Sequence, residues 1–247
     1  MQKISVVIIT FNEERNIKKC LDAICKLSDD IIVVDSFSTD KTQAICEGYE
    51  NLRFVKHKWE GYSKTKNFGN SLAKNKYILS LDADEVISHE LSSSIENINE
   101  FSGAYEFNRL TNYCGTWIKH CGWYPDKKIR IFDKNEAVWE GDFVHETLIL
   151  PKGININYLN GDLLHYSYHS VDEHYNQIER YSTLHAQKMK QGGKNASILK
   201  LYISPVFKFF RTYFLQFGFL DGKAGFLISK ISAKAVSLKY QKLKALK

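Results

Sequence analysis

Four short apolar runs alternate with segments of helical spacing in the first third of the chain, and this alternation constrains the fold most strongly. The runs are Lys3–Thr10, Ile31–Val34, Leu52–Lys56 and Tyr77–Leu81. The segments between them have apolar side chains at helical spacing: Glu13–Leu27, Asp40–Tyr49 and Ser63–Ala73. Short runs rich in β-branched residues are typical of parallel strands that are covered on both faces. The alternation therefore predicts an α/β fold with a doubly wound, mostly parallel sheet.

Polar clusters follow three of these predicted strands at the points where the strands end. They are Thr10-Phe11-Asn12-Glu13, the segment from Asp35 to Asp40, and Asp82-Ala83-Asp84-Glu85. In open α/β sheets, ligands bind beyond the carboxyl ends of the strands. Asn, Asp and Ser also cap helices, which accounts for any one cluster taken alone. The three clusters together favour a nucleotide-binding site.

Asp82 and Asp84 stand two residues apart, directly after the fourth predicted strand. Two carboxylates at one strand end can converge on a single hard cation. Mg²⁺ accepts one or two protein carboxylates and completes its shell with phosphate oxygens and water, and Mn²⁺ prefers the same ligands. An Asp-x-Asp pair is a weak signal elsewhere on a surface. At this position it predicts a Mg²⁺ or Mn²⁺ site.

Three runs resemble a family 2 glycosyltransferase with the GT-A fold: SVVIITFNEERNIKKCLDAI, IIVVDSFSTDKT and KNFGNSLAKNKYILSLDADE. The later runs WYPDKKIRIF, WEGDFVHE and GFLDGKAGF are similar to the branch that glucosylates the inner core of lipopolysaccharide. The resemblance covers nearly the whole chain. It implies a hexosyltransferase that takes its sugar, expected to be glucose, from a UDP-sugar and passes it to a glycan or a lipid-linked glycan.

The resemblance also implies a role for individual residues. Asp35 would accept a hydrogen bond from the uracil ring, Lys66 would lie over the ribose or diphosphate, and Asp84 would be the principal metal ligand, with Asp82 on the ribose or the metal. A solvated helix face is the alternative interpretation of Lys66. The complete set expected to bind the nucleotide-sugar is Thr10, Asn12, Glu13, Asp35, Ser36, Ser38, Lys66, Asn67, Asp82 and Ala83.

An inverting transfer needs a general base near the acceptor hydroxyl. The segment from Trp139 to Glu146 is rich in candidates. We expect Glu146 to be the base, with Asp142 second and Asp126 third. His145 is either a metal or diphosphate contact or a structural residue that forms hydrogen bonds.

The second half of the chain differs in pattern from the first. Tyr105–Arg109, Lys128–Phe132 and Val138–Trp139 are expected strands of a mixed sheet that closes over the active site. A polar helix is expected at residues 171–190, followed by a segment from Ile198 that is aromatic and basic. We therefore expect a GT-A domain over residues 1–170 and a helical C-terminal extension over residues 171–247.

Charge and hydropathy indicate where in the cell the protein is expected to act. The net charge is +6, and 13 Lys or Arg residues stand against one acid, Asp221, from Lys188 to Lys247. No uncharged apolar run reaches the roughly 18 residues of a membrane-spanning helix, and Ile4–Ile9 is too short for a signal peptide. We expect a cytoplasmic protein, peripheral on the inner face of the inner membrane. The alternative is a helical hairpin packed on protein, with solvated lysines.

Two other classes of function are compatible with parts of this pattern. A sugar nucleotidyltransferase also joins a nucleotide-binding sheet to metal-binding carboxylates, but its first loop is typically rich in glycine, and residues 10–14 contain none. A nucleic-acid-binding protein would suit the basic C-terminus. The acidic strand ends and the absence of a nucleic-acid motif disfavour it, so no nucleic-acid partner is expected.

Overall fold

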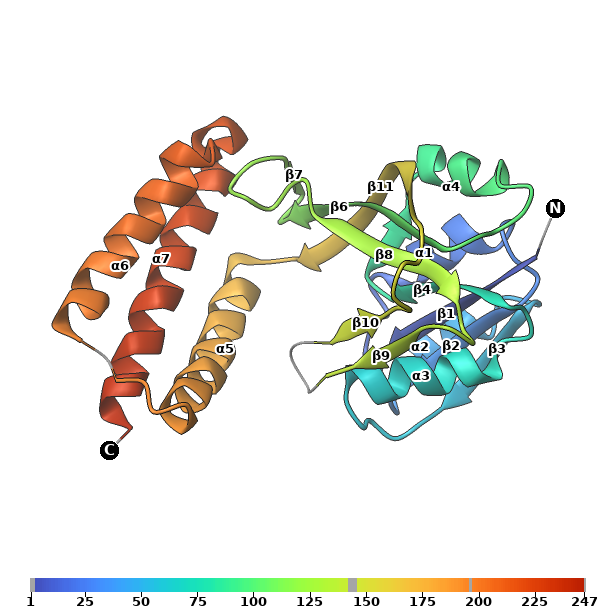
Figure 1. Cartoon of the computed structure of the whole chain (residues 1–247), viewed down its shortest axis with the longest axis horizontal. Helices are drawn as coiled ribbons and strands as arrows, with labels where there is room; N and C mark the ends of the chain where they lie inside the picture. Colours follow the sequence, from blue (N-terminus) through green and yellow to red (C-terminus); the bar gives the residue numbers. More distant parts are fainter. Residues whose placement is uncertain (1–2, 142–145, 196, 247) are drawn as a thin grey trace. The chain divides into compact units, whose positions relative to one another are not determined.

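The computed structural model describes residues 3–141, 146–195 and 197–246 (Figure 1). In chain order its elements are β1 (Ile4–Thr10), α1 (Ile17–Ile24), β2 (Ile31–Asp35), α2 (Thr42–Cys46), β3 (Leu52–Lys56), α3 (Tyr62–Leu72), β4 (Tyr77–Asp82), β5 (Glu85–Ile87), α4 (His89–Glu96), β6 (Ala104–Tyr113), β7 (Thr116–Ile118), β8 (Lys127–Asp133), β9 (Val138–Glu140), β10 (Thr147–Ile149), β11 (Ile156–Tyr168), α5 (Val171–Gln191), α6 (Ile198–Phe210), the π-helix η1 (Arg211–Leu215), the 3₁₀-helix η2 (Gly218–Asp221) and α7 (Gly222–Ala245).

The main sheet has the strand order β3-β2-β1-β4-β8-β6-β11-β5, and β7 pairs with β6. The strands β3, β2, β1 and β4 are parallel. From β8 onward the sheet becomes mixed, since β8 is antiparallel to both β4 and β6, and β11 is antiparallel to β5. The strands β9 and β10 form a separate hairpin. This arrangement confirms the expected doubly wound α/β fold with helices after it.

Helices cover both faces of the parallel strands, because alternate side chains of a strand point to opposite faces. Ile8 packs with Leu21 of α1 on one face, and Val7 lies in the apolar cluster that α3 covers on the other. Gly69 brings α3 close to the sheet, since a Cβ atom there would lie 2.5 Å from Cγ1 of Val7. This close approach positions Lys66, one turn earlier on the same helix, against the strand ends.

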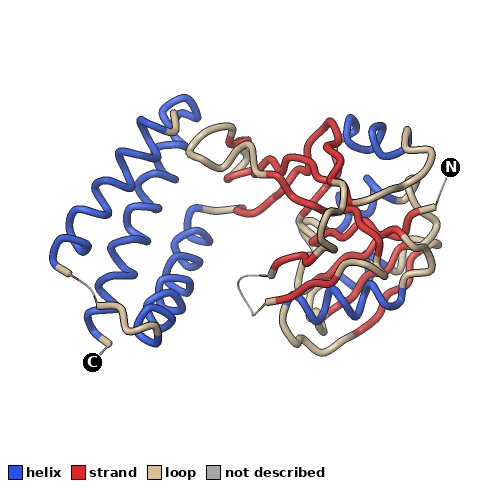
Figure 2. The backbone as a smooth tube through the Cα atoms, viewed as in Figure 1, coloured by secondary structure: helices blue, strands red, loops and turns tan. Residues whose placement is uncertain are grey.

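The chain forms two compact units, Met1–Arg109 with Asp126–His165, and Leu110–Pro125 with Tyr166–Lys247. The division into residues 1–170 and 171–247 remains a proposal about domains. In the second unit α7 packs between α5 and α6 (Figure 2). A capping box, in which Ser170 and Glu173 bond each other's backbone N–H groups, begins α5. None of the helices in the described ranges is long and apolar enough to cross a membrane.

The run GFLDGKAGF has a structural role inside the second unit. The Asp221 carboxylate accepts the backbone N–H of His120 at 2.9 Å and pairs with Nδ1 of the same residue at 2.8 Å. Gly225 lies so close to Gly218 that a Cβ atom at Gly225 would be 1.8 Å from the Gly218 carbonyl oxygen. These contacts fasten the loop after β7 to η2 and α7.

One local expectation was wrong in its bounds, and one strand was not expected. The helix α2 covers only Thr42–Cys46 of the expected Asp40–Tyr49, and the Asp40 carboxylate before it accepts the backbone N–H groups of Glu14 and Thr42. The long strand β11 was not expected, since its sequence contains Asn160 and Gly161, which disfavour strands. Pairing with β5 and its place beside β6 in the sheet outweigh that local preference.

Candidate functional site

The loops after β1 and β2 are tied together by hydrogen bonds. The Asn12 backbone N–H donates to Oγ of Ser38 at 2.8 Å, and its side-chain Oδ1 accepts the Thr39 N–H at 2.8 Å. The Ser36 N–H donates to the Thr10 carbonyl oxygen at 3.0 Å. Asn12 has a φ of 55°, a left-handed conformation that Asn tolerates better than most residues. The residues expected to line the base and ribose pocket are thus brought together.

Asp35, at the end of β2, is fully buried. Its carboxylate accepts the backbone N–H of Ser38 at 2.9 Å and also the Ser38 hydroxyl. These bonds shape the loop that holds Asn12. The role expected for Asp35, accepting a hydrogen bond from a uracil ring, remains a prediction.

Lys66, on α3, is the centre of the site. Its side chain is fully buried, so it does not lie on a solvated helix face. Its Nζ lies 3.1 Å from Oδ1 of Asp82 and 3.5 Å from Oε1 of Glu146. The ring of Trp139 lies 4.6 Å from the same ammonium group. A buried ammonium group is stable only where carboxylates or rings compensate its lost hydration, and here all three neighbours do so.

Asn67, the next residue of α3, holds the β9–β10 hairpin. Its Nδ2 donates to the Trp139 carbonyl oxygen at 2.8 Å, and its Oδ1 accepts the Trp139 N–H at 3.0 Å. Ser63 adds a bond to the Gly141 carbonyl oxygen at 3.2 Å. The amide of Asn67 therefore aligns β9 beside Lys66, and its contact with a nucleotide-sugar remains a prediction.

Asp82 ends β4 and is neutralised by two cations. Besides its contact with Lys66, its Oδ2 lies 3.2 Å from Nη2 of Arg130. Burial favours the neutral acid, yet Lys66 and Arg130 hold the pKa of Asp82 well below its usual range. Ala83 is buried, and its N–H donates to the Ile9 carbonyl oxygen at 3.2 Å, which fixes the turn that follows the strand.

Asp84 pairs with a histidine that the sequence patterns did not single out. Nε2 of His165, on β11, lies 3.1 Å from Oδ2 of Asp84. Burial alone would lower the pKa of His165, but the Asp84 carboxylate outweighs burial and raises it. Glu13 faces the same carboxylates, since burial and then Asp84 raise the pKa of Glu13 to about 7.

A buried ion network beneath the strand ends was also missed. Glu85 is fully buried, lying 2.5 Å from Nη2 of Arg130 and 3.6 Å from Nη1 of Arg109. Asp126 lies 2.8 Å from Nη2 of Arg109 and 2.8 Å from Nζ of Lys128. Asp126 thus forms ion pairs with two cations. The position of Glu85 next to the Asp-x-Asp pair was the feature of the sequence that could have pointed to this network.

The candidates for the base fall into two groups. Glu146 lies beside Lys66, with its side chain about a quarter exposed at 26%. Asp126 forms ion pairs with two cations at 2.8 Å, whereas Glu146 contacts one, Lys66, at 3.5 Å, so Glu146 remains the first candidate. Asp142 and His145 lie outside the described residues.

The donor set fits a divalent cation that also binds phosphate. Within the described ranges, no three His, Cys, Asp or Glu side chains form a metal-binding group. Mg²⁺ and Mn²⁺ nevertheless need only one or two protein carboxylates when a diphosphate supplies the other oxygens. Asp84 and Asp82 would provide such a pair. Burial first, and then the negative charge of Asp84, raise the pKa of Glu13 beside them.

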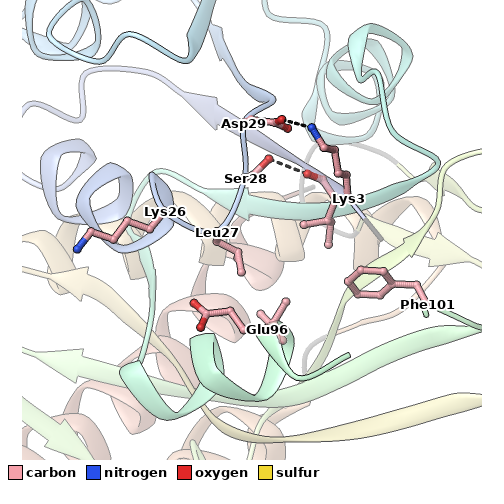
Figure 3. A pocket seen from close by; sticks show the side chains of 9 residues that line it. Lys3, Lys26, Leu27, Ser28, Asp29, Glu96 and Phe101 are labelled. Atoms are coloured by element: carbon pink, nitrogen blue, oxygen red, sulfur yellow. Dashed lines mark hydrogen bonds and ion pairs between the residues drawn. The ribbon is translucent and has the colours of Figure 1, made fainter. Parts of the chain in front are cut away.

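A cavity of about 350 Å³ lies away from these residues (Figure 3). It is lined by Lys3, which precedes β1, by Ser28 and Asp29, which precede β2, and by Phe101. It therefore lies at the amino ends of the parallel strands, whereas the polar clusters lie at their carboxyl ends. Ligands bind at the carboxyl ends in sheets of this kind, so the cavity is not part of the candidate site.

The parallel sheet, its polar carboxyl edge and the Asp-x-Asp turn define an α/β protein with a doubly wound, mostly parallel sheet. The family model described as "Glycosyl transferase family 2" matches residues 5–136. The chain is 32% identical to an uncharacterised glycosyltransferase from Rickettsia typhi, over 100% of this chain and 88% of the relative. It is 27% identical to the lipopolysaccharide core biosynthesis glycosyltransferase LpsC of Rhizobium meliloti, over 91% and 85%. The chain belongs to glycosyltransferase family 2, and its fold is GT-A.

Solved structures have a more distant similarity. TarS of S. aureus, residues 1–349, is 16% identical, with a TM-score of 0.45, 97% of this chain covered and 91% of that chain. Glucosyl-3-phosphoglycerate synthase from Mycobacterium tuberculosis, solved with Mn²⁺, UDP and phosphoglyceric acid, is 21% identical, with a TM-score of 0.36, 45% of this chain covered and 44% of that chain.

Proposed function

We propose that this glycosyltransferase moves a hexose, glucose from UDP-glucose, onto the core of lipopolysaccharide or another lipid-linked glycan, with inversion at the anomeric carbon. The observation that carries the proposal is the position of Lys66. It lies 3.1 Å from Asp82 at the donor-binding strand end and 3.5 Å from Glu146 on the β9–β10 hairpin. One buried cation therefore joins the expected donor side to a carboxylate suited to proton transfer.

The donor would be bound by the loops after β1 and β2 and by the Asp-x-Asp turn. Asp84, with Asp82, would hold Mg²⁺ or Mn²⁺, which would neutralise charge on the departing diphosphate. Asp84 is the better ligand of the two, because Lys66 and Arg130 already compensate the charge of Asp82. His165 at 3.1 Å would orient the Asp84 carboxylate, as groups bonded to metal ligands commonly do.

Glu146 would take the proton of the acceptor hydroxyl. As that proton leaves, the acceptor oxygen forms its bond to the anomeric carbon, and the bond from that carbon to the phosphate oxygen breaks, with its electron pair leaving on UDP. The contact with Lys66 would hold the Glu146 carboxylate in position for this transfer. Asp142 and His145 remain further candidates in the same segment.

The acceptor and location are supported by the relative LpsC, whose name places it in lipopolysaccharide core biosynthesis. We propose that this protein acts as a peripheral protein on the cytoplasmic face of the inner membrane. A lipid-linked acceptor would be held at that surface. The basic C-terminal part, with 13 Lys or Arg residues against one acid, suits an anionic bilayer.

The test is to incubate the protein with UDP-glucose, Mn²⁺ and a lipopolysaccharide core that lacks its outer sugars, and to examine the product by NMR. A β-linked glucose formed together with free UDP is the expected result, since UDP-glucose carries an α-linkage. An α-linked product would contradict inversion. Formation of UTP and glucose 1-phosphate when pyrophosphate is added to UDP-glucose would instead identify a sugar nucleotidyltransferase.

A further inference from the structure

The helix α6 and the π-helix η1 carry a continuous row of exposed apolar side chains, here called the aromatic face. Its members recur at helical spacing: Tyr202, Ile203, Val206, Phe207, Phe210 and Phe214. Val206 is 70% exposed and Tyr202 is 67% exposed. The end of η1 and the segment through η2 add Leu215, Phe217 and Leu220, each exposed by more than half. Single exposed apolar residues are ordinary, but a contiguous patch of this kind marks a binding surface.

The aromatic face is not used for packing within the second unit. The opposite side of α6 packs on α7, where the ring of Phe209 contacts the ring of Phe226 with centroids 5.9 Å apart. In Figure 1 α6 lies alongside α7, and α5 contacts α7 from its other side. One face of α6 therefore packs against α7, and the other is exposed to solvent.

Cations border the aromatic face. Lys200 and Arg211, both exposed, stand three residues before Ile203 and four residues after Phe207, on one edge of the row. Lys223 is exposed just beyond η2. The single acid of this region, Asp221, has a side chain only 5% exposed and is already bound to His120. Apolar rings flanked by cations, without a competing exposed acid on α6, complement an anionic lipid surface.

We infer that the aromatic face inserts into the headgroup region of an anionic bilayer, with Lys200 and Arg211 on the lipid phosphates. The inference deepens the proposed function, since a lipid-linked acceptor would be held at that surface. Lipid fits better than a protein partner. Among the six residues named in the row, Tyr202 alone has a polar side-chain group, whereas a protein interface typically carries several hydrogen bonds. The helix would lie in the plane of the membrane, because its 13 residues are too few to span a bilayer.

The test is flotation of the full chain with vesicles of phosphatidylcholine alone or mixed with phosphatidylglycerol, without nucleotide-sugar. We expect flotation with the anionic vesicles, weakening as salt is raised. Phe207→Ser with Phe210→Ser should lower the partition coefficient by at least about tenfold. The control removes two apolar side chains elsewhere that are 45% and 40% exposed, Ile156→Ser with Leu184→Ser, and should float like the unaltered protein.

A second pair of variants tests the charges. Lys200→Glu with Arg211→Glu should abolish binding at low salt, while Lys188→Glu with Lys190→Glu, which changes net charge equally on α5, should retain most of it. Circular dichroism checks that every variant is folded. Equal losses in test and control pairs, or no flotation of the intact chain, would overturn the inference.

Sedimentation of the intact chain without lipid tests whether the aromatic face binds a second copy of this protein instead. A stable dimer that Phe207→Ser with Phe210→Ser converts to monomer would overturn the inference in favour of self-association. UDP release is measured separately in solution, so a failure of sugar transfer and a failure of membrane binding can be told apart.

Discussion

The buried ammonium group of Lys66 lies 3.5 Å from a carboxylate oxygen of Glu146, although the two residues come from α3 and from the end of the β9–β10 hairpin. The contact depends on Asn67, which bonds both backbone polar groups of Trp139 and so holds the hairpin beside the helix. It joins the residue expected to lie at the donor diphosphate to the residue expected to take the acceptor proton.

Lys66→Met should lower turnover about 10²-fold, an effect comparable to losing one preorganised charge in an active site. The variant keeps the length of the side chain but leaves Asp82 and Glu146 without their shared cation. Lys64→Met, at an exposed position of the same helix, is the control and should be fully active. Steady-state kinetics with both variants decide the matter. Normal activity of Lys66→Met would reduce Lys66 to a packing residue.

Glu146→Gln should lower turnover by about 10²–10⁴, the typical contribution of a general base. UDP binding, measured by calorimetry, should hardly change, because the base faces the acceptor. Glu140→Gln, on the same hairpin but exposed, is the control. An active Glu146→Gln with an inactive Asp142→Asn would place the base four residues earlier. Activity of both would direct attention to Asp126 despite its two cations.

Asp35→Ala should weaken UDP binding by about 1–3 kcal/mol, the cost of leaving buried hydrogen-bonding groups unpaired. The change removes the acceptor of the Ser38 N–H and loosens the loop that holds Asn12. Calorimetry should find unchanged affinity for Asp29→Ala, which lies at the opposite edge of the sheet. Equal affinities of all three proteins would leave Asp35 a purely structural residue.

His174 should make stability depend on pH. Its ring is 4% exposed, with Nδ1 3.1 Å from the Tyr113 hydroxyl, and burial lowers the pKa of His174 to about 4. An unfolded chain binds this proton near pH 6.5. As pH falls from about 6.5 to about 4, His174 becomes protonated in the unfolded state but stays neutral in the folded state. The free energy of unfolding therefore decreases, by up to about 3 kcal/mol.

Melting temperatures at pH 7.5 and pH 5 measure this effect. His174→Gln should show a smaller difference between the two pH values than the unaltered protein. His89→Gln, on α4 of the other unit, is the control and should behave like the unaltered protein. An unchanged pH dependence in His174→Gln would exclude His174 as its source.

The sequence predicted the parts of the fold and site that depend on local pattern. The β-branched runs that became β1 and β2 and the Asp-x-Asp turn after β4 were placed correctly, because strand pattern and strand-end polarity are local properties. His165 and the Glu85–Arg130 pair were missed. His165 and Asp84 are 81 residues apart in the chain, and Arg130 and Glu85 are 45 apart, so only the strand order brings them together.

Release of UDP from UDP-glucose tests the central claim, metal-dependent use of a nucleotide-sugar, most directly. With Mn²⁺ or Mg²⁺ the unaltered protein should release UDP, excess chelator should stop the release, and added metal should restore it. Asp84→Ala, at a partly exposed turn, should fold normally and release none, because the charge of the departing diphosphate is left uncompensated. Full activity in excess chelator, or in Asp84→Ala, would contradict the account.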